Sequence, residues 1–193
     1  MRILVAEDDP LIAMALVERL RSLGHEPLGP AADGEEAVAI AKGAGADLYL
    51  FDIEMPSVDG LAAAVRLTEE GLRRPVVVIT GVDNPELIER SIASGVSAYL
   101  AKPIDTRELQ AALELAAARH AELVALEAQA SEARQALEDR KVVERAKGLL
   151  MSALELSEQE AFRRLQLTAR ERNLGLAEVA SRIVDQASLL RTR

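Results

Sequence analysis

Carboxylates occur in the first half of the chain directly after short apolar runs that have the length and composition of buried strands. They are Glu7, Asp8 and Asp9 after the first run, and Asp52 after the third. The carboxyl ends of parallel strands meet at one edge of a sheet, where open α/β folds place their ligands. Gathered carboxylates repel one another unless a cation sits among them, and all-oxygen ligands favour a hard ion such as Mg²⁺. The pattern therefore predicts a Mg²⁺ site.

Two later apolar runs end in residues suited to a phosphoryl group, Thr80 and Lys102. The lysine compensates charge, the hydroxyl bonds a phosphoryl oxygen, and Asp52 can then be a nucleophile that forms an aspartyl phosphate. Each residue has an ordinary alternative, since strand ends often carry acids, a lone lysine is usually solvated and Thr80 could cap a strand. Their joint placement favours phosphoryl chemistry, and we expect Asp52 to be exposed at the lip of the core.

Strand and helix patterns alternate over the first hundred residues, which predicts an α/β fold with a five-stranded parallel sheet covered on both faces. The predicted strands are Ile3–Ala6, Glu26–Gly29, Leu48–Phe51, Val76–Thr80 and Ala98–Ala101, and the predicted helices lie near 10–22, 34–43, 58–70 and 84–94. The second strand contains Pro27 and Gly29, which suits an edge.

No strand pattern remains from Asp105 onward, and Thr106 to about Ala153 predicts one very long helix. A 3-4-3-4 spacing of mostly apolar residues within it is typical of a coiled-coil seam. The seam positions are Leu109, Ala112, Ala116, Arg119, Leu123, Leu126, Ala130, Ala133 and Leu137. The alternative, an amphipathic helix packed on its own domain, remains open.

Two further helices are predicted at the end of the chain. Ser157 and Glu160 form a capping box that opens a helix through about Arg172. Asn173 and Gly175 then interrupt, and a last helix covers 176–190. The tail is therefore an all-α domain of three helices, the first continuous with the long helix.

Charge divides the chain into an acidic body and a basic tail. The net charge is −9, with 11 Lys+Arg against 23 Asp+Glu in residues 1–133 and 12 against 9 in residues 134–193. This favours two modules with different partners. The absence of cysteine excludes disulfides and zinc–cysteine sites. Acids begin too early for a signal peptide and no apolar run has transmembrane length, so we expect a cytoplasmic protein without a membrane partner.

Residues 1 to about 120 resemble the receiver domain of bacterial two-component response regulators. The matching segments are ILVAEDDP, LFDIEMPSVDG, VVVIT and AYLAKP, in the family's order and at its separations. The resemblance implies a flavodoxin-like fold and phosphorylation by a sensor histidine kinase.

The resemblance also implies a role for each acid at the predicted edge. Asp52 would be the phosphoacceptor and Asp8 a direct Mg²⁺ ligand. Glu7 would act mainly through water, and Glu54 would contribute its backbone carbonyl to the metal. Asp9 would fall outside the metal shell, because the acid pair of the family directly follows the strand.

Three further receiver residues receive roles in the same way. Thr80 and Lys102 would bind the phosphoryl oxygens, and Tyr99 would reorient upon phosphorylation together with Thr80. The family pattern is complete, so we expect an active receiver.

The first helix of the tail contains a glycine, Gly148, at a cost of roughly 1 kcal/mol relative to alanine. A glycine at such a position suggests the close approach of another backbone, from its own bundle or from a nucleic acid. Basic residues surround it on neighbouring turns and on the next helix, namely Arg140, Lys141, Arg145, Lys147, Arg163 and Arg164. The alternative is a helix-packing glycine among solvated basic residues.

Residues 134 to about 190 resemble the ANTAR domain, the RNA-binding output of AmiR- and NasR-type antiterminators. The matching segments are RKVVERAKGLLM, LSEQEAFRRL and LAEVASRIV. The resemblance implies a dimer that binds paired RNA hairpins in a leader transcript and prevents a terminator from forming. Phe162 is the only aromatic residue of the tail, so arginine and lysine contacts would carry most of the affinity.

Together these patterns predict a phosphorylation-controlled antiterminator with a receiver domain at 1–120, a coiled-coil linker at 105–140 and an RNA-binding domain at 134–190. Its homodimer would depend on phosphorylation or be strengthened by it. One alternative is a DNA-binding response regulator that acts as a transcription factor. Another is a stand-alone phosphoryl enzyme, although we expect no turnover of a separate substrate.

Overall fold

The computed structural model describes residues 1–81 and 95–191, with side chains through Ala187. The chain divides into two compact units, Met1–Val124 and Ala125–Arg193. The helix predicted near 84–94 lies outside the described residues. Among the helices of the described part, none is long and apolar enough to cross a membrane.

The first unit contains a parallel sheet whose strand order is β2-β1-β3-β4-β5. The strands are β1 (Arg2–Ala6), β2 (Glu26–Ala31), β3 (Leu48–Asp52), β4 (Val76–Thr80) and β5 (Ala98–Ala101). The predicted five-stranded parallel sheet is confirmed, with β2 at an edge. The order reverses between β1 and β3, and this switch point is where an open α/β sheet leaves room for a site.

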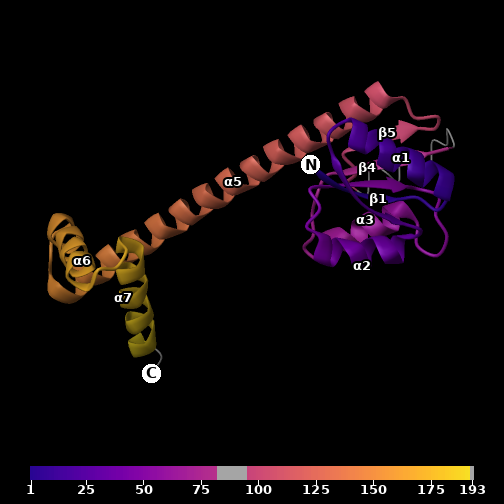
Figure 1. The fold of residues 1–193 in the computed structure, drawn as a ribbon. Coiled ribbons are helices and arrows are strands. Elements are labelled where there is room, and N and C mark those ends of the chain that lie inside the picture. The colour runs from indigo at the N-terminus through magenta and orange to yellow at the C-terminus, as the bar shows by residue number, and fades with distance from the viewer. Residues whose placement is uncertain (82–94, 192–193) are drawn as a thin grey trace. The chain divides into compact units, whose positions relative to one another are not determined.

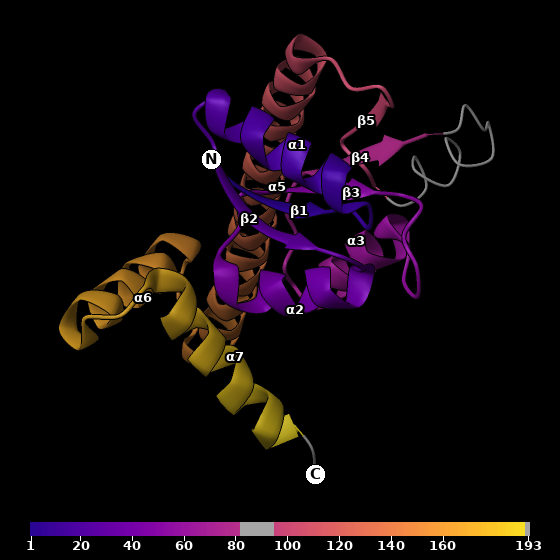
Figure 2. The same cartoon turned by 45° about the vertical axis from the view of Figure 1, so that its right-hand side comes forward.

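Helices cover both faces of this sheet, with α1 (Pro10–Ser22) and the start of α5 (Thr106–Leu154) on one face. The other face carries α2 (Gly34–Ala44) and α3 (Gly60–Glu69) (Figure 1; Figure 2 turns the view). The residues of β3 and β4 are buried throughout, which explains their unbroken apolar runs. The two layers hold the carboxyl edge of the sheet in place.

Aspartates begin three helices of the receiver-like unit. Asp9, Asp33 and Asp59 are the N-caps of α1, α2 and α3, and each accepts a backbone hydrogen bond of 2.7–2.8 Å from the first turn. Such a cap stabilises a helix by about 1 kcal/mol. Acids in these loops therefore have two uses, and the carboxylate of Asp9 serves the helix.

The long helix α5 is continuous from Thr106 to Leu154, as predicted, and the boundary of the two units falls inside it. Its first seam positions, Leu109, Ala112 and Ala116, are buried against the sheet. The later leucines are exposed; Leu123, Leu126 and Leu137 have 41, 56 and 54% of their surface accessible. The intramolecular alternative therefore holds for the start of the seam, and only the later part is open to a partner.

The second unit contains the end of α5 together with α6 (Glu158–Arg172) and α7 (Leu176–Arg191), drawn in orange to yellow in Figure 1. The capping box of Ser157 and Glu160 is present, and Asn173 ends α6 in the left-handed conformation. A small core joins the three helices: Ala146, Leu165, Ala169, Val179 and Ala180. The predicted three-helix all-α arrangement is confirmed.

Candidate functional site

Strand register brings the predicted receiver residues to one edge. Ala6 of β1 pairs with Phe51 of β3, so the residues that follow, Glu7 and Asp52, lie side by side at the strand ends. Thr80 ends β4 opposite Ala101 of β5, and Lys102 comes next. The long lysine side chain spans the remaining distance to Asp52.

Lys102 bridges two buried carboxylates. Its Nζ lies 2.7 Å from Asp52 Oδ2 and 2.9 Å from Glu7 Oε2. Asp52 is only 3% exposed and Glu7 only 2%. The expectation of an exposed Asp52 was therefore wrong. Asp52 is the last residue of β3, paired with β4, and the side chain of Lys102 lies against its carboxylate.

Burial and charge act together on this cluster. Burial raises the pKa of Glu7, and the hydrogen bond from Lys102 only partly opposes that effect. Burial alone would lower the pKa of Lys102, but its hydrogen bonds to Asp52 and Glu7 outweigh burial and raise it. The Lys102 ammonium group therefore stays protonated, and its one positive charge is shared between the carboxylates of Glu7 and Asp52.

The acids fit a small hard cation. Glu7, Asp8 and Asp52 each offer one carboxylate oxygen, and these oxygens lie within 4.8 Å of one another. Within the part of the chain that the structure describes, no group donates a hydrogen bond to the buried Glu7 Oε2, although Lys102 Nζ lies 2.9 Å from it. Asp8 is exposed, which leaves a route from solvent. An all-oxygen donor set with an unsatisfied buried oxygen suits Mg²⁺.

Two other acids lie beside this group with different contacts. Glu54 is exposed, and its backbone N–H donates to Asp52 Oδ1 at 3.3 Å. The role of its carbonyl in metal binding stays a prediction. Asp9 points its carboxylate at the backbone of α1, and its N–H donates to Glu7 Oε1 at 3.4 Å.

The two predicted switch residues differ in exposure. Thr80 is buried at the end of β4, with 7% of its surface accessible, whereas Tyr99 in β5 is 55% exposed. Their coupling upon phosphorylation stays a prediction.

Gly60 lies against the end of β3, and no role was assigned to it from the sequence. A Cβ added there would lie 2.1 Å from the carbonyl oxygen of Asp52. Only a glycine permits α3 to begin so close to the end of β3. The signal was available in the sequence, since Pro56 and Gly60 follow the strand at close spacing.

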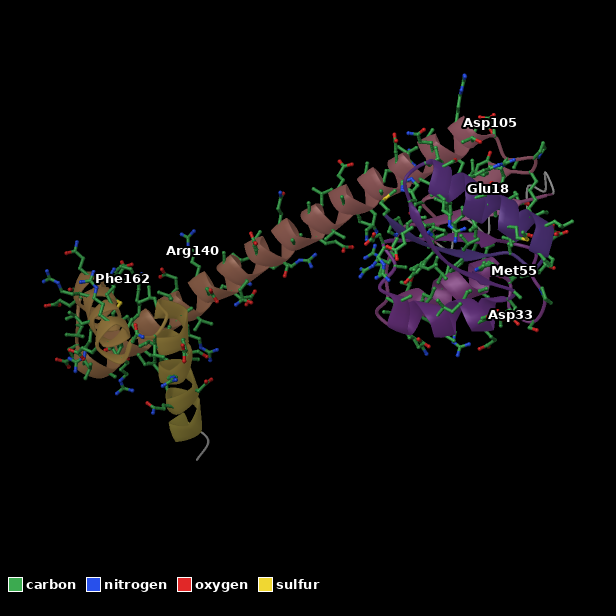
Figure 3. All side chains as sticks on the ribbon, in the orientation of Figure 1. Glu18, Asp33, Met55, Asp105, Arg140 and Phe162 are labelled. Atoms are coloured by element: carbon green, nitrogen blue, oxygen red, sulfur yellow. The ribbon has the colours of Figure 1, made fainter. Side chains whose placement is uncertain are left out.

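In the second unit, five of the predicted RNA-binding residues are exposed: Arg140, Lys141, Arg145, Arg163 and Arg164. Arg140 projects outward from α5 in Figure 3. Lys141 forms an exposed ion pair with Glu138 at 2.7 Å, a weak interaction that a phosphate can replace. These guanidinium and ammonium groups are available to an anion.

Lys147 has a different position from the one expected. It is 8% exposed, and its Nζ contacts Glu144 at 2.9 Å and Glu158 at 2.7 Å. It also lies 5.9 Å from the centroid of the Phe162 ring. The hydrogen bonds that Lys147 donates to Glu158 and Glu144 raise the pKa of Lys147. Lys147 therefore joins α5 to α6 and is less accessible than the five exposed basic residues, and its contact with RNA stays a prediction.

Gly148 is exposed, and a Cβ added there meets no described atom within 4 Å. Packing inside its own bundle, one of the two explanations considered from the sequence, therefore does not account for this glycine. The other explanation, the close approach of a nucleic-acid backbone to Gly148, stays a prediction.

Both units match known families. Residues 3–114 match the response regulator receiver domain, and residues 131–184 match the ANTAR domain. This chain belongs to the response regulator family.

Among curated proteins, this response regulator is similar to the transcriptional regulatory protein PdtaR of Mycobacterium tuberculosis. The two are 40% identical over 184 residues, which cover 95% of this chain and 89% of PdtaR. The similarity extends through both units and the helix they share.

Solved structures resemble the receiver unit of this response regulator. The receiver domain of a modulated diguanylate cyclase from Desulfovibrio desulfuricans is 34% identical, covers 61% of this chain and 94% of its own, and gives a TM-score of 0.57. Chemotaxis protein CheY4 of Vibrio cholerae is 27% identical, with 58% and 95% covered and a TM-score of 0.55. The Borrelia burgdorferi CheX–CheY–BeF3–Mg complex gives 25% identity, 58% and 86% coverage and a TM-score of 0.56.

The stretch between the two family matches, residues 115–130, lies entirely within α5 of this response regulator. It contains Leu123 and Leu126, two of the exposed apolar seam residues.

Proposed function

We propose that this response regulator accepts a phosphoryl group on Asp52 from the phosphohistidine of a sensor histidine kinase. Phosphorylation then strengthens a homodimer that binds paired RNA hairpins in a leader transcript in the cytoplasm and causes antitermination. The observation that carries the proposal is the buried Asp52 carboxylate, held 2.7 Å from Lys102 within an acid cluster and joined to an ANTAR domain in one chain.

In the proposed transfer, an oxygen of Asp52 attacks phosphorus as the P–N bond to the donor imidazole breaks, and the electron pair leaves with the imidazole nitrogen. Oδ1 suits the attack, because it accepts a long hydrogen bond of 3.3 Å from the Glu54 N–H, whereas Lys102 holds Oδ2 at 2.7 Å. The Lys102 ammonium stabilises the charge on the phosphoryl oxygens. Mg²⁺ held by Glu7, Asp8 and Asp52 would neutralise the same oxygens when bound. The CheX–CheY complex of Borrelia burgdorferi was solved with Mg²⁺ and BeF3, which supports Mg²⁺ binding by a receiver of this kind.

The exposed seam supports the homodimer. Leu123, Leu126 and Leu137 follow the 3-4 spacing along α5 and are exposed in a single chain. A second α5 would cover them at knobs-into-holes spacing. The second unit of each chain is called the output unit below. When two output units are held together and one has bound a hairpin, the other meets the linked second hairpin at a raised effective concentration. Phosphorylation needs only to stabilise the dimer to raise the apparent affinity for RNA.

The deciding experiment compares an RNA with two linked hairpins and an RNA with one, at one fixed salt concentration, with and without acetyl phosphate. The two-hairpin RNA should respond far more strongly to phosphorylation, and Asp52→Ala should remove the response. Equal responses from the two RNAs would contradict the dimer coupling. Tighter binding of duplex DNA would favour the alternative, a DNA-binding transcription factor.

A matched pair of variants tests the seam. Leu126→Glu should weaken self-association of the phosphorylated protein in sedimentation. Leu115→Glu adds the same charge to an apolar residue of α5 that is 48% exposed but off the seam, and should leave self-association unchanged. If neither variant changes self-association, the seam does not form the dimer.

We also propose that the chain is not an enzyme with a substrate of its own. Asp52 would be phosphorylated and slowly lose the group to water. Sustained release of phosphate from a small phosphate ester would contradict this.

A further inference from the structure

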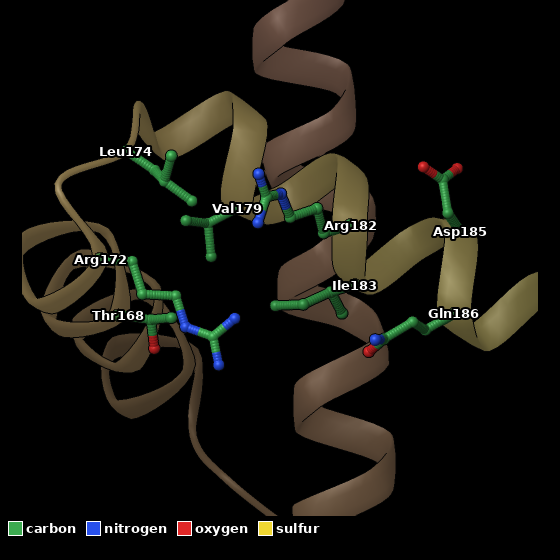
Figure 4. Close-up of a pocket in the computed structure, with 8 residues that line it drawn as sticks. All are labelled: Thr168, Arg172, Leu174, Val179, Arg182, Ile183, Asp185 and Gln186. Carbon is green, nitrogen blue, oxygen red and sulfur yellow. The ribbon is translucent and has the colours of Figure 1, made fainter.

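A pocket of about 410 Å³ lies between α6 and α7 in the second unit. Its lining residues are Thr168, Arg172, Leu174, Val179, Arg182, Ile183, Asp185 and Gln186 (Figure 4). This volume lies within the range of small-ligand sites, about 300–1,000 Å³. None of these residues belongs to the basic set assigned to RNA above.

The pocket has an apolar wall. Leu174, Val179 and Ile183 extend toward one another in Figure 4, and they are partly or fully buried. They belong to the edge of the small core, so the wall is held by the packing of the three helices. Such a wall suits the flat face of a ring.

The charged groups that line the pocket are two arginines and one aspartate. Arg182 from α7 extends toward Val179, and Arg172 from α6 extends past Thr168 into the space between the helices (Figure 4). Arg182 forms an exposed pair with Glu178 at 2.8 Å, and the described part of the chain gives Arg172 no ion pair. Asp185 points away from the two guanidinium groups, with Ser181 Oγ 3.5 Å from its Oδ2.

Gln186 completes the pocket from α7, with its side chain directed toward the space between the helices. A carboxamide both donates and accepts hydrogen bonds, as the edge of a nucleobase does. Guanidinium planes stack on unpaired bases and bind the adjoining phosphates. Apolar wall, two guanidinium groups and one carboxamide together match a single nucleotide more closely than a plain anion or an apolar side chain.

We propose that this pocket holds one unpaired base of an RNA loop, with Arg172 and Arg182 at its face and phosphate and Gln186 at its edge. The inference rests on the proposed RNA binding and adds where a loop base is received. The exposed basic residues of α5 and α6 would then contact the backbone without regard to sequence, and the pocket would supply the preference for an unpaired loop.

The experiment uses the full chain phosphorylated with acetyl phosphate. The probe is a hairpin with a constant stem, taken from a pool of randomised loops enriched on the wild-type protein. A second probe has the same stem and an abasic loop. Arg172→Ala and Gln186→Ala remove two pocket groups, both exposed, so the core is left intact. Arg170→Ala is the matched control, because it removes the same charge from α6 at a residue that does not line the pocket.

Fluorescence anisotropy at one fixed salt concentration gives the affinities. The wild type should bind the abasic loop about tenfold more weakly, the size of one stacked base. Arg172→Ala and Gln186→Ala should weaken binding of the normal loop by several-fold and leave the abasic loop nearly unaffected. Arg170→Ala should weaken both probes equally or neither.

Other outcomes overturn the inference in separable ways. Equal loss of both probes in Arg172→Ala and no loss in Gln186→Ala would make Arg172 a phosphate contact only. Loss of self-association in the pocket variants would assign the pocket to a second copy of the chain. A pool from which the wild type enriches no hairpin at all would overturn the proposed function itself.

Discussion

Each unit of the chain holds one lysine between two carboxylates, and the two sites differ in the burial of the acids. Around Lys102, the side chains of Glu7 and Asp52 are 0 and 4% exposed. Around Lys147, those of Glu144 and Glu158 are 56 and 67% exposed. The distances are nearly the same, from 2.7 to 2.9 Å in both.

The difference in burial distinguishes the proposed phosphorylation site from a structural contact. Buried carboxylates are costly to keep charged, and one lysine shares its charge between both of them. Such a site gains by taking up a cation or a phosphoryl group. The exposed acids around Lys147 are already hydrated, so that lysine only connects α5 with α6 and packs near Phe162.

The largest expected difference concerns phosphorylation. Asp52→Ala should abolish labelling by acetyl phosphate, because the attacking oxygen is gone. Glu158→Ala removes the equivalent acid partner of Lys147 and should leave labelling unchanged. Mass spectrometry of the intact protein measures both.

Asp9→Asn sharpens this test within the acid edge. Asparagine keeps the N-cap of α1 while it removes the charge, so labelling should remain near the wild-type level. If Asp9→Asn lost labelling as completely as Asp52→Ala, Asp9 would belong to the metal shell.

The second difference concerns stability. Lys102→Met leaves Glu7 and Asp52 buried without a counter-charge. It should lower the free energy of unfolding of the receiver unit by about 2 kcal/mol. The loss is smaller than for a fully buried ion pair, because Lys102 is partly exposed. Saturating Mg²⁺ should restore part of the loss. Lys147→Met should lower the stability of the output unit by less, with no response to Mg²⁺.

The two phenylalanines make this measurement specific to each unit. Phe51 lies in the receiver core and Phe162 on α6, and the chain contains no others. Fluorine-labelled phenylalanine therefore gives one NMR signal per unit during urea unfolding. If Mg²⁺ raised the stability of Lys147→Met as read at the Phe162 signal, the proposed difference between the Lys102 and Lys147 sites would be wrong.

The sequence was sufficient for the sheet and the site edge, because the apolar runs of β1, β3 and β4 are continuous and the functional residues come directly after them. The same local pattern could not fix the burial of Asp52, which depends on where Lys102 reaches from a strand two places away in the sheet. The local pattern also could not show which seam residues of α5 are buried and which are exposed. Leu109 and Leu126 are equally apolar, and only Leu109 packs against the sheet.

In the output unit, charge alone was a poor guide. Arg145 and Lys147 are both basic and lie two residues apart in the motif, but Lys147 contacts Glu158 of α6 whereas Arg145 is exposed. Tertiary contacts between helices decide which cation is free, and helical periodicity does not contain them. The pocket between α6 and α7 arises in the same way from residues without a local motif.

Gly148→Ala gives a smaller effect. Because an added Cβ meets no described atom, alanine should stabilise the isolated output unit by about 1 kcal/mol through helix propensity. RNA affinity should fall if an external backbone approaches this glycine. Gly60→Ala is the contrast, since the same change meets the Asp52 carbonyl and should destabilise the receiver unit. A stabilised Gly148→Ala protein with unchanged RNA affinity would leave the glycine unexplained by RNA contact.

The smallest effect is the pH dependence of the Lys147 contact. The hydrogen bond from Lys147 lowers the pKa of Glu158, so this part of the stability is present above the ordinary carboxyl pKa and is lost as pH falls through the lowered value. The pKa of Lys147 itself is raised, so its contribution is present below the ordinary lysine pKa and is lost as pH rises through the raised value. The stability difference between wild type and Lys147→Met, read at the Phe162 signal, should therefore be largest between about pH 5 and pH 10.

Lys141→Met is the matched control, because Lys141 pairs with one exposed acid and should give a smaller difference over the same range. A Lys147→Met difference that persisted undiminished at pH 3 would mean that packing near Phe162, and not the two ion pairs, joins the helices.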